Sequence, residues 1–111
     1  MKTPEEVVQA QVDAYNARDL EAFLATYADE IVLVNDGKER ILAKAALRTG
    51  YGKLFSENPE LSCIVLNRES AGNTVIDDER VDGLADGGRR EARATYELEN
   101  GLIRRVSFSP L

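Results

Sequence analysis

The 111-residue chain contains no histidine, and this absence excludes several kinds of chemistry. Without an imidazole there is no Ser-His-Asp or Cys-His arrangement, and most zinc sites are excluded as well. A general base in this protein has to be a carboxylate, a lysine, a tyrosine or water. We expect neither a metal site nor a cofactor.

Cysteine and long apolar segments are also scarce. Cys63 is the single cysteine and cannot form an internal disulfide, which indicates a reducing compartment, so we expect a cytoplasmic location. Residues 1–8 contain one lysine and lack the apolar core of a signal peptide. The longest apolar run is four residues, as in 31–34, which is far too short to span a membrane.

Positive charge is in the minority, because the formal net charge is −6. Nucleic-acid binding requires a basic surface, and an anionic membrane repels an acidic protein, so neither partner is expected. The hydrophobic content of 43% and the charged content of 31% are typical of a globular protein. The length fits one domain, which we place at residues 1–111.

Three helices are predicted in the first half of the chain. Thr3 is a favourable N-cap, Pro4 suits the first helical position, and Glu6 completes a capping box. Asp19 is the predicted N-cap of a second helix that continues through Tyr27. A third helix is predicted over residues 44–58, with apolar side chains along one face.

The segments between and after these helices are predicted as strands and turns, which gives an α+β fold with three N-terminal helices on an antiparallel sheet. Strands are predicted over residues 31–35, 39–43, 60–70, 74–82, 90–99 and 102–109. A two-residue loop between the last two strands would place Leu98 opposite Ile103. A three-residue loop with a left-handed Gly101 places Leu98 opposite Leu102 and Ala94 opposite Val106, and we prefer this register because it pairs apolar residues along the hairpin.

Three consecutive acids, Asp77, Asp78 and Glu79, interrupt the apolar pattern of residues 74–82. Because strand side chains alternate, Asp77 and Glu79 share one face and Asp78 lies on the other. In one interpretation, Asp77 and Glu79 are a carboxylate pair at a pocket, one with a raised pKa. In the other, which we favour, arginines on neighbouring strands pair with the acids.

The motif order resembles that of the nuclear transport factor two-like superfamily, in its SnoaL-like and ketosteroid-isomerase-like branch. The similar segments are VVQAQVDAYNARDLEAFLATYADEIVLV, GNTVIDDERVDG and YELENGLIRRVSF, which together with the helices cover most of the chain. The resemblance implies a cone, in which a strongly curved sheet wraps around the helices and leaves a pocket. It also implies a homodimer formed through the sheet.

The resemblance assigns catalytic positions that this sequence does not fill. The base position of the ketosteroid isomerases corresponds to Asn35, the tyrosine position to Gln11, and the position of the protonated acid to Ala94. A classical ketosteroid isomerase is therefore not expected. Asp36, next to Asn35, remains a candidate base together with Asp77 and Glu79, although we favour a turn role for Asp36 because Asn-Asp-Gly is a strong turn sequence.

Two functions remain open. The first is a cone that binds a small, largely apolar molecule and transfers protons without a cofactor. The second is a ligand-binding or dimerisation module without catalysis, since the family positions are not filled. The predicted ligand-binding residues are Gln11, Tyr15, Tyr27, Asn35, Tyr51 and Tyr96.

Overall fold

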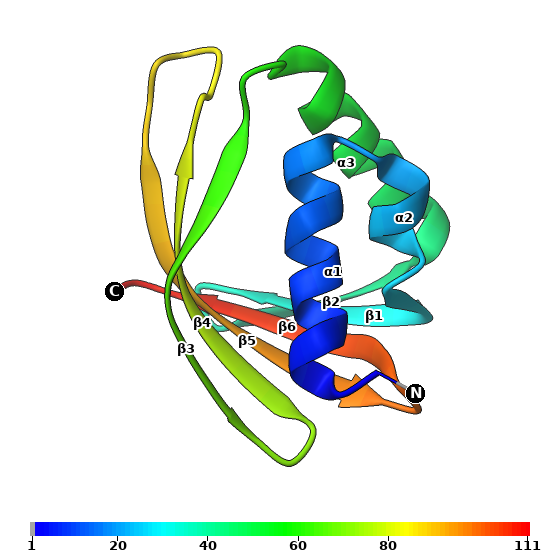
Figure 1. Cartoon of the computed structure of the whole chain (residues 1–111). Helices are drawn as coiled ribbons and strands as arrows, with labels where there is room; N and C mark the ends of the chain where they lie inside the picture. The colour runs from blue at the N-terminus through cyan, green and yellow to red at the C-terminus, as the bar shows by residue number, and fades with distance from the viewer. Residues whose placement is uncertain (1) are drawn as a thin grey trace.

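The computed structural model describes residues 2–111, as three helices and six strands (Figure 1). The helices are α1 (Pro4–Ala17), α2 (Leu20–Leu24) and α3 (Lys44–Glu57). The strands are β1 (Tyr27–Asn35), β2 (Lys38–Ala43), β3 (Ser62–Ala71), β4 (Thr74–Asp82), β5 (Arg90–Glu99) and β6 (Leu102–Ser109). None of the helices within residues 2–111 is long and apolar enough to cross a membrane.

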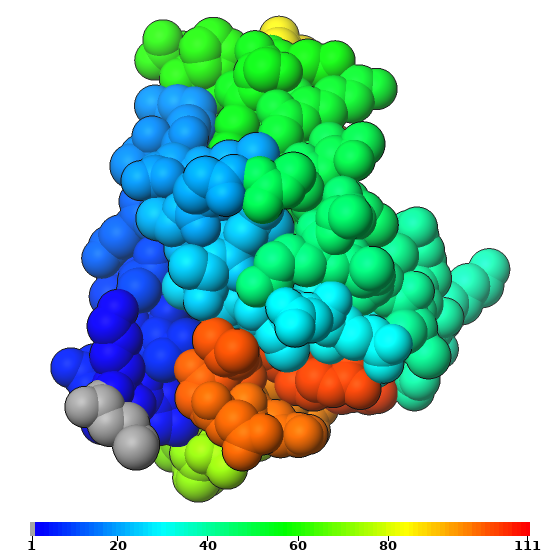
Figure 2. Space-filling view, turned by 90° about the vertical axis from the view of Figure 1, so that its right-hand side faces the viewer, coloured from blue at the N-terminus to red at the C-terminus, as the bar shows by residue number. Residues whose placement is uncertain are grey.

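The six strands form one sheet in the order β2-β1-β6-β5-β4-β3. The predicted antiparallel pairing is confirmed for four of the five neighbouring pairs, while β1 and β6 run parallel. The sheet curves strongly, and α1 crosses its concave face (Figure 1). Viewed from the helix side, α1, α2 and α3 cover the sheet, with the β5–β6 hairpin below them (Figure 2). The α+β cone predicted from the sequence is confirmed.

Helix α1 begins at the predicted capping box. The backbone N–H of Glu6 donates to the Thr3 hydroxyl at 3.2 Å, and the N–H of Thr3 donates to the Glu6 carboxylate at 2.8 Å. These two bonds satisfy N–H groups that have no partner within the helix. Val8 and Val12 lie on the buried face of α1, which fixes this helix against the sheet.

Helix α2 is shorter than predicted. The expected cap is present, because the N–H of Ala22 donates to the Asp19 carboxylate at 3.1 Å. The helix ends at Leu24, however, and Tyr27 is already the first residue of β1. The N–H of Ile103 donates to the Thr26 carbonyl at 2.9 Å, and Tyr27 pairs with Ile103 in the sheet. Pairing with β6 therefore converts the end of the predicted helix into strand.

The hairpin between β5 and β6 has a two-residue loop, so the preferred three-residue loop is wrong. Asn100 and Gly101 both have positive φ, 54° and 77°, as in the type I′ turn that Asn-Gly favours. Leu98 therefore pairs with Ile103, and Leu102 pairs with Glu99 rather than with Leu98. The left-handed conformation predicted for Gly101 is present.

A bulge further along the hairpin compensates for the short loop. The register of β5 and β6 shifts next to Arg104, which leaves this residue without a direct partner. Beyond the bulge, Val106 pairs with Tyr96 and Phe108 pairs with Ala94, instead of the predicted pairing of Ala94 with Val106. Apolar residues are thereby kept on the concave face on both sides of the bulge.

Aromatic rings connect the three helices to the sheet. Phe23 of α2 is fully buried, and its ring centroid lies 4.5 Å from that of Tyr51 on α3 and 5.1 Å from that of Tyr27 on β1. The ring of Tyr15 on α1 lies edge-on to that of Phe55, with centroids 5.5 Å apart. These are favourable distances for aromatic pairs, and the three tyrosines of the cluster line the cavity described next.

Candidate functional site

A cavity of about 130 Å³ lies between α1, α3 and the concave face of the sheet. It is large enough for several water molecules or one small organic molecule. Its wall contains Glu79 and five of the six residues predicted to bind a ligand, namely Gln11, Tyr15, Tyr27, Tyr51 and Tyr96. The fold thus brings together side chains from α1, α3, β1, β4 and β5.

Glu79 is the carboxylate in the wall of this cavity, and 9% of its surface is exposed. The Tyr96 hydroxyl donates a hydrogen bond to Glu79 Oε2 at 2.8 Å. Burial raises the pKa of Glu79 to about 7, because a charged carboxylate is poorly solvated inside the protein. The hydrogen bond from Tyr96 opposes this rise, and the nearby negative charge of Asp77 adds to it.

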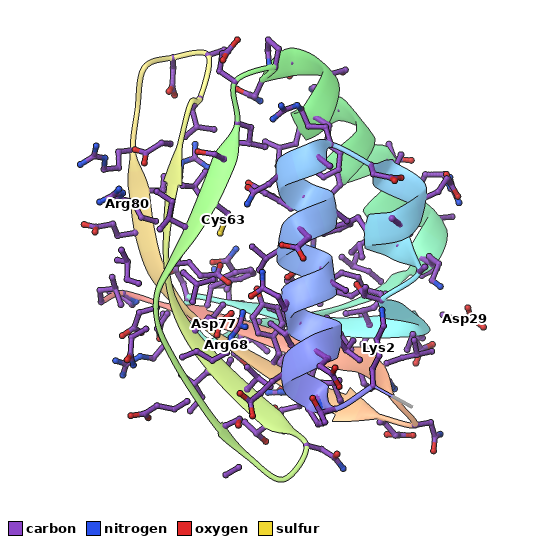
Figure 3. The ribbon with its side chains drawn as sticks, in the orientation of Figure 1. Lys2, Asp29, Cys63, Arg68, Asp77 and Arg80 are labelled. Carbon is purple, nitrogen blue, oxygen red and sulfur yellow. The ribbon has the colours of Figure 1, made fainter. Side chains whose placement is uncertain are left out.

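Asp77 lies on the same face of β4 as Glu79 but has a different environment. It is fully buried, and the Arg68 guanidinium donates to both of its carboxylate oxygens, at 2.7 and 2.8 Å. Figure 3 places this pair between the sheet and α1, where Arg68 also donates to Gln9 Oε1 at 2.8 Å. Asp77 does not line the cavity. Its carboxylate is bound by an arginine of a neighbouring strand, as in the interpretation favoured from the sequence.

Asp78 points to the opposite, convex face of the sheet. Arg93 of β5 donates to its two oxygens at 2.8 and 3.3 Å, and this pair lies near solvent. The three consecutive acids of β4 therefore have three separate environments: Asp77 is paired inside, Asp78 is paired outside, and Glu79 faces the cavity without an ion-pair partner among the described residues.

The tyrosines of the cavity wall remain protonated over the whole physiological range. Burial raises the pKa of Tyr51 to about 12, and it raises the pKa values of Tyr15, Tyr27 and Tyr96 above the ordinary value of 10. A protonated phenol can both donate and accept a hydrogen bond. The wall therefore combines apolar ring surface with hydroxyl groups that can be directed at a bound molecule.

Asn35, the sixth predicted ligand-binding residue, lies outside this cavity. It lines an adjoining cavity of about 280 Å³ together with Arg90, Glu79, Val81 and Phe108. The last three of these residues also line the internal cavity, so the two spaces adjoin, with Glu79 at their common boundary. We call the second space the outer cavity.

Arg90 was not singled out among the predicted site residues, although it lines the outer cavity. Ala92, Ala94 and Tyr96 alternate along β5, and extending that alternation by one step places Arg90 on the same concave face. Asp36, in contrast, is exposed in the β1–β2 turn with a φ of 53° and lines neither cavity. The position of Asp36 in the turn explains why an aspartate is suited to this place in the chain.

Cys63 contributes a buried thiol to the wall of the internal cavity. Its sulfur points from β3 toward α1 (Figure 3), and burial raises its pKa to about 12. The thiol therefore stays protonated and behaves as a small apolar group. Within residues 2–111, no three side chains of the metal-binding types lie close enough to hold a metal ion.

The structure is a cone in which helices close a curved sheet, and a single carboxylate, Glu79, lies in the wall of its internal cavity. The family model of the SnoaL-like domain matches residues 8–106, and the chain belongs to this family. No curated protein matches the sequence significantly.

Several solved structures share the fold. An uncharacterised cystatin-fold protein from Novosphingobium aromaticivorans is 22% identical, with a TM-score of 0.87 over 98% of this chain and 99% of that one. An NTF2-like protein of unknown function from Cytophaga hutchinsonii is 16% identical, with a TM-score of 0.82 over 98% and 90%. A Mycobacterium tuberculosis protein in complex with estradiol-17β-hemisuccinate is 19% identical, with a TM-score of 0.79 over 96% and 93%.

The ionisation of Glu79 should make the stability of the protein depend on pH. Its folded pKa of about 7 lies above the ordinary value of 4.5, so between these values the folded state binds more protons than the unfolded state. The associated stability is fully present below pH 4.5 and is lost as pH rises to about 7. The expected loss is about 3 kcal/mol in the free energy of unfolding.

Urea unfolding of the wild type and of Glu79→Gln, at half-unit steps from pH 4.5 to 8, measures this effect. The variant cannot ionise at residue 79 and should lack this part of the pH dependence. The carboxyl carbon-13 shift of Glu79 should titrate with a midpoint near 7. Parallel pH profiles for the two proteins would contradict the assignment.

Proposed function

We propose that the internal cavity binds a small, largely apolar molecule and that Glu79 exchanges a proton with it. The observation that carries this proposal is a single buried carboxylate in the cavity wall, with a pKa of about 7 and no arginine partner among the described residues. General bases are most effective when their pKa lies near the working pH. Of the three candidate bases, Asp36 is exposed in a turn and Asp77 is bound by Arg68.

The surrounding hydroxyls suit proton abstraction next to a carbonyl group. When Glu79 removes such a proton, negative charge develops on the carbonyl oxygen and must be stabilised by donors. Tyr15, Tyr27 and Tyr51 line the same cavity and keep their hydroxyl protons. Tyr96 donates to Glu79 itself and so holds the carboxylate in position.

Ligand binding without catalysis is the second candidate. The positions that the ketosteroid-isomerase resemblance assigns to the base, the tyrosine and the acid are Asn35, Gln11 and Ala94 here. The Mycobacterium tuberculosis structure in complex with a steroid ester supports small-molecule binding as the more general role of the fold. The two candidates differ in whether Glu79 is required for chemistry or only contributes to the cavity wall.

Deuterium exchange at the carbons next to the carbonyl of cyclohexanone separates these candidates. We expect the wild type to accelerate this exchange about 10²-fold relative to Glu79→Gln, which is the lower end of a general-base contribution. The acceleration should grow as pH rises toward 7, because the ionised carboxylate is the base. Equal exchange rates in the two proteins would reject the catalytic role and leave the binding role.

A second assay, with a steroid substrate, tests the specificity of the cavity. The isomerisation of 5-androstenedione, followed by absorbance, should not reach an enzyme-like rate. The internal cavity of about 130 Å³ is by itself smaller than typical drug-sized sites, which start at about 300 Å³, and the aligned base position is filled by Asn35 in the outer cavity. An Asn35→Asp variant tests the aligned base position, and turnover confined to that variant would place residue 35 at the bound steroid.

We also propose that the protein is a homodimer formed through the sheet. Ile41 on β2 and Ile64 and Leu66 on β3 are exposed large apolar residues, and these strands are the two edges of the sheet. Ile64 alternates with the buried Cys63 and therefore faces away from the helices. Sedimentation at micromolar concentration should give twice the chain mass of 12.3 kDa, and a clean monomer would reject the dimer.

A further inference from the structure

Gln11 carries a buried hydrogen-bond acceptor that no described residue satisfies. The residue lies on α1 in the cavity wall and is 6% exposed, and its Oε1 atom has no partner within residues 2–111. The Gln11 side chain opposes the rise in the pKa of Tyr27 that burial causes, which is the effect of an N–H donor near the phenol. The oxygen of the amide remains available to the cavity.

An unpaired buried acceptor restricts which molecules can occupy the cavity. Water that enters the free cavity can donate to Gln11 Oε1. A ligand that displaces this water without supplying a donor leaves the oxygen unsatisfied, which lowers its affinity. A ligand with an O–H group in the same place retains the bond. The amide of Gln11 thus favours a hydroxyl-bearing ligand over an apolar molecule of the same shape.

The size and charge of the internal cavity further restrict the class of ligand that can bind. A cavity of about 150 Å³ in another protein accommodates benzene, so about 130 Å³ suits a single ring. The wall supplies tyrosine rings for such a ligand, and it contains no lysine or arginine among its lining residues. An anionic group would be desolvated there without a counter-charge, next to Glu79, and is therefore disfavoured.

We propose that the ligand is a neutral, single-ring molecule whose hydroxyl group donates to Gln11 Oε1, and that Gln11 determines this preference. The inference rests on the binding part of the proposed function and is independent of proton transfer by Glu79. Phenol and toluene are suitable probes because they have nearly the same shape and differ by a hydroxyl in place of a methyl group.

Titration of each probe into the isotope-labelled protein, followed by backbone amide shifts in α1, α3 and β3, measures both affinities. We expect the wild type to bind phenol about tenfold more tightly than toluene, as one buried hydrogen bond provides. In Gln11→Met, which keeps the length and helix propensity of the side chain, this preference should disappear or reverse. Circular dichroism and urea unfolding establish that the variant is folded.

Gln9→Met is the matched control, because it makes the same exchange at an exposed position of the same helix that does not line the cavity; it removes the hydrogen bond from Arg68 but no group that faces the cavity. It should leave the preference for phenol unchanged. Equal affinity for both probes in the wild type, or an unchanged preference in Gln11→Met, would overturn the inference while the binding proposal stands. Failure of both probes to shift any cavity residue would overturn the inference together with the binding part of the proposed function.

Discussion

Gly83→Val should destabilise the protein by about 4 kcal/mol, which puts it in the small class of severe substitutions. Gly83 follows β4 and has a φ of +79°, in the left-handed region. A Cβ atom there would lie 1.9 Å from the Glu60 carbonyl oxygen and 2.5 Å from the Glu60 carbonyl carbon. Backbone atoms cannot move aside as a flexible side chain can, so the two segments have to separate.

The contacts around Gly83 explain why separation would be costly. The turn that contains Glu60 leads from α3 into β3, and Leu61 beside it is 1% exposed in the core. The same turn is held to the loop after β4, because the N–H of Ala85 donates to Asn58 Oδ1 at 2.8 Å. Moving the backbone away from Gly83 would therefore disturb the core and break this hydrogen bond.

Gly101→Val is the matched control for the conformational part of this effect. Gly101 has nearly the same φ, +77°, but a Cβ atom there would have nothing within 4 Å. Its replacement should cost only the left-handed conformation, about 1–2 kcal/mol. Urea unfolding of the three proteins gives the comparison. Similar losses in the free energy of unfolding for both variants would show that the close approach of Gly83 to Glu60 does not contribute to the loss.

Local signals in the sequence predict the local features of this fold. The capping box of Thr3 and Glu6 and the Asp19 cap involve residues three positions apart, and both are present. The length of α2 depends instead on a hydrogen bond from Ile103 to Thr26, across most of the chain. The parallel pairing of β1 with β6 could not be predicted for the same reason. The periodicity of a strand does not identify its partner when that partner lies far away in the sequence.

In the candidate site too, local features are predictable from the sequence, whereas contacts between distant residues are not. Strand alternation predicts that Asp77 and Glu79 share a face, and the structure places both on the concave side. Which carboxylate is paired depends on where β3 presents Arg68, and the sequence offers several arginines on neighbouring strands. The predicted hairpin register was wrong for a related reason. The two-residue loop and the bulge at Arg104 occur together, and only their combination keeps the apolar face buried.

Arg68→Met should destabilise the protein by about 3–5 kcal/mol, because it removes one partner of a buried ion pair. Asp77 is fully buried and receives two hydrogen bonds from the Arg68 guanidinium. Without them a carboxyl group stays in the core with its main donors removed, and its desolvation is no longer compensated. The expected loss comes from the remaining Asp77 and not from the missing arginine.

The double variant Arg68→Met, Asp77→Leu tests this reasoning directly. Replacing both members of a buried pair by apolar residues is often neutral or stabilising, so the second change should recover most of the lost stability. Recovery would show that the uncompensated carboxyl group is the cause. Additive losses would instead indicate that the pair itself, or the contact of Arg68 with Gln9, is a net source of stability.

Arg93→Met is the matched control, because Asp78 and Arg93 form the equivalent pair on the convex face. Asp78 is the next residue on β4, and its arginine also comes from a neighbouring strand. Half of the Arg93 side chain is exposed, so solvent screens the charges and the loss should stay below about 1 kcal/mol. Equal losses for Arg68→Met and Arg93→Met in urea unfolding would contradict the argument, since they would mean that the burial of Asp77 makes no difference to the cost of leaving it unpaired.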